Sequence, residues 1–70
     1  MYIVKTVVVG FDYYLKFLPE TMHRPYSQWK FKLEGLKNNA TTFTKAKAEE
    51  VANFVPNVLA EAVAFNQKTV

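Results

Sequence analysis

Residues 2–9 constrain the fold of this chain most, because they form a run of β-branched and aromatic side chains that ends at Gly10. Such residues are enriched in strands, so the run predicts a strand with a turn or bulge at the glycine. Side chains alternate between the two faces of a strand, and both faces are largely apolar here. One face carries Ile3, Val7 and Val9, and the other carries Tyr2, Val4 and Val8. The strand is expected to be covered on both sides, or to meet another molecule on its second face.

Neither a disulfide nor a structural metal is expected to stabilise the core of this chain. It has 70 residues and no cysteine, and its single histidine, His23, gives too few ligands for a structural zinc site. A domain of this size needs a dense core or self-association, and half of the residues are apolar. We expect one domain over residues 1–70.

The cellular location can be predicted from the absence of membrane-spanning and signal-peptide patterns in the sequence. No apolar run approaches the roughly 20 residues of a membrane-spanning helix. Residues 1–10 do not resemble a signal peptide, because Lys5 interrupts them, no basic residue precedes the run and no small-residue cleavage site follows. The missing cysteines fit a reducing compartment. These features predict a cytoplasmic protein that does not contact a membrane.

Three further segments predict strands or short pairings. Residues 13–18 follow the glycine closely enough for an antiparallel hairpin, and Pro19 would end them. Residues 29–33 alternate between apolar and basic side chains, which is typical of a half-buried strand. Residues 40–43 could add a short pairing. Between the second and third predicted strands, residues 19–28 form the longest irregular stretch.

A helix is predicted from Thr44 to about Val55. Thr44 is a suitable N-cap, and Phe43 before it could pack on Ala48. An apolar stripe with helical spacing runs through Ala48, Val51, Ala52 and Val55. Pro56 and Asn57 are expected to end the helix.

Residues 58–65 fit either a strand, by their alternation, or a helix, by their three alanines. The strand is preferred, because one helix on a sheet needs enough strands to bury its stripe. Residues 66–70 are expected to be a frayed tail. The predicted class is α+β: a small antiparallel sheet of three to four strands with one helix on one face, in the order β-β-β-α-β. The helix would leave the other face partly uncovered, and an exposed apolar face is typical of an interface.

No pattern of catalytic, cofactor-binding or metal-binding residues is present. His23 lies near Thr21 and Ser27, but no motif supplies the third group that orients a nucleophile and its base. The six carboxylates have no spacing typical of a metal or glycosidase site, and the two glycines cannot form a phosphate-binding loop. A non-catalytic protein that binds a partner is therefore predicted.

The predicted partner-binding surface joins the uncovered sheet face to the long loop. The sheet would contribute Val4, Val8 and Tyr14, and the loop would contribute His23, Arg24 and Tyr26. Tyrosine and arginine are enriched among residues that dominate binding energy at interfaces.

Two alternatives remain at this stage. The first is a nucleic-acid-binding module that uses Lys30, Lys32, Lys45 and Lys47; the chain carries a net charge of +3, and two of these lysines lie in the first helical turn, where cations are disfavoured. The second is a structural homodimer.

Three stretches resemble small accessory proteins of bacteriophages. They are the opening Met-Tyr-Ile-Val-Lys, the mid-chain Trp29, and residues 40–52 with Phe-Thr-Lys, Ala-Glu and Val-Ala. Residues 4–10 are also similar to the first strand of a toxin-neutralising protein of T-even-type phages. The resemblance implies a phage-encoded protein that binds and modulates a host protein, in the host cytoplasm.

Overall fold

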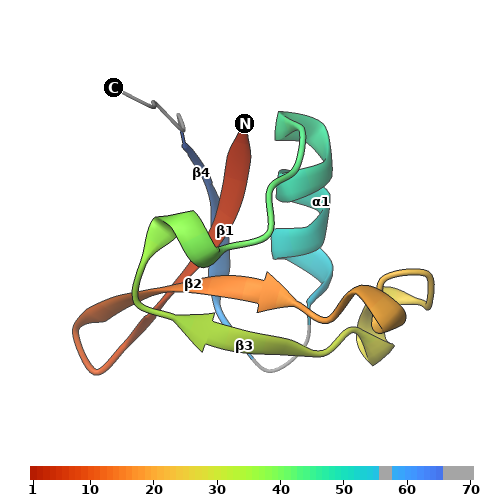
Figure 1. The fold of residues 1–70 in the computed structure, drawn as a ribbon, viewed down its shortest axis with the longest axis horizontal. Coiled ribbons are helices and arrows are strands. Elements are labelled where there is room, and N and C mark those ends of the chain that lie inside the picture. Colours follow the sequence, from red (N-terminus) through yellow and green to blue (C-terminus); the bar gives the residue numbers. More distant parts are fainter. Residues whose placement is uncertain (56–57, 66–70) are drawn as a thin grey trace.

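A computed structural model describes residues 1–55 and 58–65 as an antiparallel sheet with one helix packed against it (Figure 1). The strands follow the order β3-β2-β1-β4, so β1 is central and β4 lies at one edge. The elements are β1 (Tyr2–Val8), β2 (Phe11–Phe17), β3 (Phe31–Glu34), α1 (Lys45–Phe54) and β4 (Ala60–Ala64). The predicted α+β class and the order β-β-β-α-β are confirmed.

β1 and β2 form a hairpin with a two-residue turn at Val9 and Gly10. Val8 pairs with Phe11, and both turn residues have positive φ, 51° at Val9 and 81° at Gly10. Two-residue turns of this kind match the right-handed twist of the flanking strands. β2 therefore begins two residues earlier than predicted, at Phe11 instead of Tyr13.

The segment between β2 and β3 is built from two short 3₁₀ turns, Pro19–Thr21 and Tyr26–Gln28. The Trp29 indole N–H donates to the Arg24 carbonyl at 2.8 Å and ties the segment together. The Trp29 backbone N–H closes the second turn on the Tyr26 carbonyl. β3 therefore begins at Phe31, and the prediction of a strand from residue 29 is wrong by two residues.

α1 has the cap and the buried face that the sequence predicts. The Thr44 side chain accepts a hydrogen bond from the Lys47 backbone N–H at 3.3 Å, as an N-cap does. Ala48, Val51 and Val55 are buried, which confirms the predicted stripe. Pro56 and Asn57, expected to end the helix, lie outside the described residues.

The last described segment forms a strand, as predicted, over Ala60–Ala64. It pairs antiparallel with β1, so the first and last strands of the described residues lie side by side (Figure 1). Phe43 also forms a bridge with Tyr2, through hydrogen bonds of 2.9 and 2.8 Å, which confirms the predicted short pairing near residues 40–43. The tail predicted at residues 66–70 lies outside the described residues.

The sheet has a core on each of its faces. Toward α1, Val4, Leu15 and Phe17 form a cluster with Trp29 and the helix stripe. On the opposite face, Ile3 and Tyr14 pack with Ala40, Val63 and Phe65. Ile3 and Val4 are both fully buried, which confirms that β1 is covered on both sides.

Candidate functional site

The structure does not place Val4, Val8 and Tyr14 on one uncovered sheet face. Val4 is fully buried under α1, whereas Tyr14 lies on the opposite face, nearly buried beneath the segment that contains Ala40. The cause is the register, in which Lys5 pairs with Tyr14 and shares its face, whereas Val4, the neighbour of Lys5 in β1, lies on the other face. Of the three, only Val8 retains an exposed side chain. The predicted sheet surface is therefore wrong as a shared surface.

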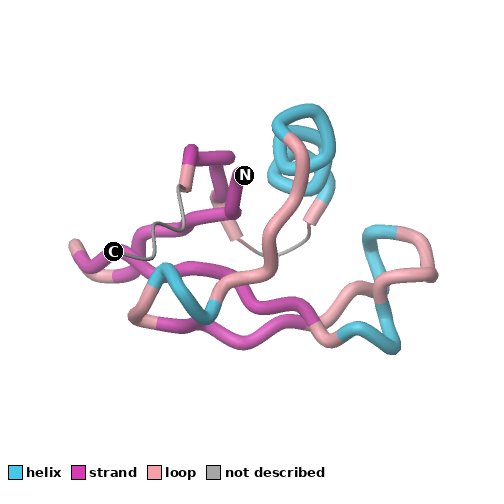
Figure 2. Tube along the Cα trace, turned by 45° about the horizontal axis from the view of Figure 1, so that its top comes forward, coloured by secondary structure: helices cyan, strands magenta, loops and turns pink. Residues whose placement is uncertain are grey.

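The loop residues lie at the other end of the molecule from the β1–β2 turn. Both views show this separation along the long axis (Figures 1 and 2). His23 and Arg24 are exposed, and no described group forms a hydrogen bond or ion pair with either of their side chains, although the Arg24 carbonyl accepts from the Trp29 indole. They therefore lie apart from Val8, which belongs to the β1–β2 hairpin.

Tyr26 is partly buried and is bound to α1. Its hydroxyl donates to Glu50 and accepts from Lys47 Nζ at 2.6 Å. Its ring stacks on Phe54 with 5.8 Å between centroids and meets Trp29 edge-on at 4.8 Å. Tyr26 therefore holds the loop against the helix, and its predicted role in partner binding gains no support from this position.

The four lysines of the nucleic-acid alternative do not form one patch. Strand alternation places Lys32 on the sheet face away from α1, whereas Lys45 and Lys47 belong to α1. Lys47 lies over the Tyr26 ring at 5.0 Å, and its hydrogen bond to the Tyr26 hydroxyl raises the pKa of Lys47. Lys30 is exposed near the start of β3. The structure instead pairs Lys32 with Lys16 across the strands, a like-charge pair that sequence analysis missed.

Exposed apolar side chains gather at the tip of the β1–β2 hairpin. We call Val7, Val8, Val9 and Phe11 the hairpin patch, which wraps around the turn because Val8 and Phe11 share one face of the hairpin and Val7 lies on the other. Val9 is 90% exposed and Phe11 is 68% exposed, although both are large apolar residues. Figure 1 shows the turn projecting away from α1 at the lower left. The patch therefore extends from the body of the domain, where a concave surface can receive it.

The backbone at Val9 adds a second unusual feature. A β-branched residue at φ 51° is a steric outlier, because its Cβ crowds the backbone in the left-handed region. Glycine and asparagine are the residues that turns of this kind favour at such positions. The chain thus keeps an exposed valine where the turn disfavours it. The Val-Gly pair inside an otherwise strand-like run is the sequence signal that could have located this site.

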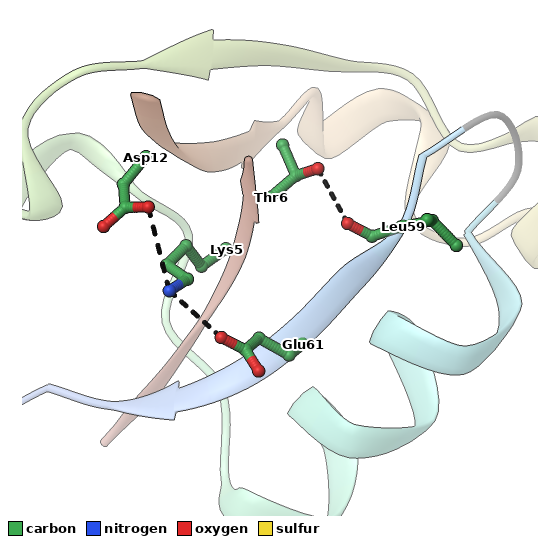
Figure 3. A network of polar contacts seen from close by, with 5 residues as sticks. All are labelled: Lys5, Thr6, Asp12, Leu59 and Glu61. Carbon is green, nitrogen blue, oxygen red and sulfur yellow. Dashed lines mark hydrogen bonds and ion pairs between the residues drawn. The ribbon is translucent and has the colours of Figure 1, made fainter. Parts of the chain in front are cut away.

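A polar network lies between β4 and the base of the hairpin (Figure 3). Lys5 Nζ is 3.0 Å from Glu61 and 3.8 Å from Asp12, and the hydrogen bond to Glu61 raises the pKa of Lys5. The buried Thr6 hydroxyl donates to the Leu59 carbonyl at 2.7 Å. These contacts fix the end of β4 against β1.

An open hollow of about 380 Å³ lies beside this network. It is lined by Lys5, Thr6, Val7, Leu59, Ala60 and Glu61. Its two charged side chains, Lys5 and Glu61, are paired with each other. The rest of its lining is mainly apolar.

Residues 1–55 and 58–65 contain no group of three or more His, Cys, Asp or Glu side chains placed to hold a metal ion. In the same part of the chain, no helix is long and apolar enough to cross a membrane. The hairpin patch combines exposed apolar side chains with the positive φ of Val9. No protein-family model, no curated protein and no solved structure matches this chain.

Proposed function

We propose that this chain is a non-catalytic protein-binding module whose hairpin patch inserts into an apolar groove of a partner protein. The observation that carries the proposal is Val9, which is both exposed and held at an unfavourable φ. Strain of this kind persists where the surrounding structure over-determines it, and it clusters at functional sites. Large exposed apolar patches are likewise typical of interaction sites.

Val8 is the residue that this proposal shares with the surface expected from the sequence. Val4 and Tyr14, the other two sheet residues of that expected surface, are buried and do not belong to the patch. The resemblance to bacteriophage accessory proteins would make the partner a host protein whose activity the module modulates. Binding through apolar side chains predicts an affinity that changes little with salt, unlike phosphate contacts.

The test uses a variant that separates binding from folding. Asparagine is tolerated in the left-handed region, so Val9→Asn removes the apolar side chain without adding strain. A photo-crosslinking amino acid at Phe11 identifies the protein that contacts the patch, with the same probe at Gln28 as a control at the other end of the molecule. The purified partner is then titrated with each variant.

We expect Val9→Asn and Phe11→Ser each to weaken binding at least tenfold, whereas Arg24→Ala leaves the affinity unchanged. Equal binding by the native chain and Val9→Asn would refute the role of the patch. Cosedimentation of the native chain with lipid vesicles, lost in Val9→Asn, would also refute it, because the apolar groups would then serve a membrane.

A further inference from the structure

The outer edge of β4 is unpaired among the described residues, and its orientation can be derived from one hydrogen bond. The Phe65 N–H donates to the Met1 carbonyl at 2.9 Å, so these two residues form a hydrogen-bonded pair. Such pairs alternate along an antiparallel ladder. Glu61 and Val63 therefore direct their N–H and C=O groups to β1, and Ala60, Ala62 and Ala64 direct theirs outward. Tyr2 agrees, because it pairs with Ala64 but bonds to Phe43 on its other side.

This edge lacks the features that usually protect an edge strand. Natural edges are blunted by lysine, proline, bulges or inward-pointing charges. β4 reads Ala-Glu-Ala-Val-Ala, and its one charged side chain, Glu61, is paired with Lys5 inside the chain. The opposite edge, β3, carries Lys32 and Glu34. The two edges of the sheet are therefore unequal, and β4 is the one open to a further strand.

We infer that β4 pairs with β4 of a second copy of this chain, antiparallel and centred on Ala62. In this register Ala62 lies opposite Ala62 of the other copy, and Ala60 lies opposite Ala64. Each of these is a hydrogen-bonded pair that exchanges two backbone bonds, because all three alanines direct their backbone groups outward. The two-fold axis stands perpendicular to the sheet, so both α1 helices lie on the same face of one continuous sheet.

Leu59 gives the independent reason for choosing a second copy over another extended chain. It is 94% exposed, next to a strand that packs against the core. The same register places Leu59 opposite Phe65 of the other copy and on the same face, because the two positions are equally distant from Ala62. Phe65 already packs with Ile3 and Tyr14, so the apolar cluster of that copy would extend over Leu59. This contact comes from the chain's own symmetry and needs no other sequence.

The pairing does not depend on the hairpin patch, so the two proposals fail separately. Amide hydrogen exchange on the full chain tests it with an internal control. The Ala60, Ala62 and Ala64 amides should become protected as protein concentration rises, in step with a mass that doubles in sedimentation. The Glu61, Val63 and Phe65 amides face β1 and should stay protected at every concentration. Fast exchange of the three alanine amides, with the mass of one chain at high concentration, would overturn the inference.

Two variants complete the test. Ala62→Pro removes the central outward N–H but keeps the β1 ladder, so a folded monomer is expected; Ala62→Ser keeps the N–H and should remain a dimer. Should the proline variant fail to fold, Leu59→Ser replaces an exposed side chain and should weaken the dimer at least tenfold while Val9→Asn does not. A monomer whose three alanine amides become protected only when the partner binds would overturn the pairing with a second copy and assign the edge to a strand from that partner.

Discussion

At the scale of single residues, Val9 offers the simplest measurable consequence of the fold. Its φ of 51° costs an L-residue about 1 kcal/mol or more relative to asparagine or glycine, which enter this region routinely. We therefore expect Val9→Asn to raise the free energy of unfolding by about 1 kcal/mol and the melting temperature by about 4–8 °C. Thermal unfolding followed by circular dichroism measures both. Val7→Asn, on the same hairpin but at an ordinary strand position, should not stabilise the protein.

Lys5 provides a residue-scale prediction about pH. Its bond to Glu61 raises the pKa of Lys5 above the ordinary value of 10.5. A raised lysine pKa means that the stabilisation is fully present below pH 10.5 and is lost as the pH rises through the folded-state pKa. Titration of the Lys5 side-chain carbon by NMR should give the raised value, and Glu61→Gln should bring it back toward 10.5. An unchanged pKa in Glu61→Gln would contradict the assigned cause.

At the scale of elements, the register of β2 and β3 predicts a repulsion that can be relieved. Lys16 and Lys32 lie directly opposite each other, and such like-charge pairs are destabilising. Lys16→Glu should therefore stabilise the protein by about 0.5 kcal/mol. Lys16→Glu combined with Lys32→Glu should lose that gain, because it restores a like-charge pair. Additive effects in this double-mutant cycle would show that the two side chains do not interact.

Most elements follow from local patterns and could be predicted from the sequence. The β-branched run predicts β1, and Thr44 predicts the start of α1. The apolar stripe predicts which face of α1 is buried. The register between strands could not be predicted, because it depends on a turn whose first residue, Val9, is atypical for its conformation. One consequence is that the sequence pattern groups Tyr14 with Val4, although the pairing of Lys5 with Tyr14 places Tyr14 on the opposite face.

The candidate site was harder to predict than the fold, for a related physical reason. Tyr26 has the composition of an interface residue, but tertiary contacts with Glu50 and Phe54 hold it in place. The exposure of Phe11 likewise follows from the projection of the hairpin, which a single sequence does not reveal. The sequence shows which residues are of a type that often binds partners. Only the packing shows which of their side chains are exposed.

At the scale of the whole molecule, the sheet has to be covered on both faces for the domain to fold. Ile3 and Val4 are neighbours in sequence, fully buried, and on opposite faces. Ile3→Ala and Val4→Ala should each cost about 2–4 kcal/mol, because each leaves a cavity in one of the two cores. Val7→Ala, at an exposed site on the same strand, should cost under about 0.5 kcal/mol. Denaturant unfolding followed by tryptophan fluorescence and by circular dichroism should give coincident transitions, whereas separate transitions would mean that the two cores unfold independently.

The pairing of the first strand with the last also determines when this protein can finish folding during its synthesis. β1 leaves the ribosome before the other strands, but one side of it remains without a neighbour until Ala60–Ala64 have been made. Pairing of segments so distant in sequence is slow, because a long loop must close, at a cost in entropy, before the stabilising contacts form. A nascent or prematurely terminated chain therefore displays its central β-branched strand with an open side, which is the kind of segment that aggregates or recruits chaperones. Completion of the sheet is a late event, and every shortened form of this chain that ends before residue 60 should depend on cellular quality control for its removal.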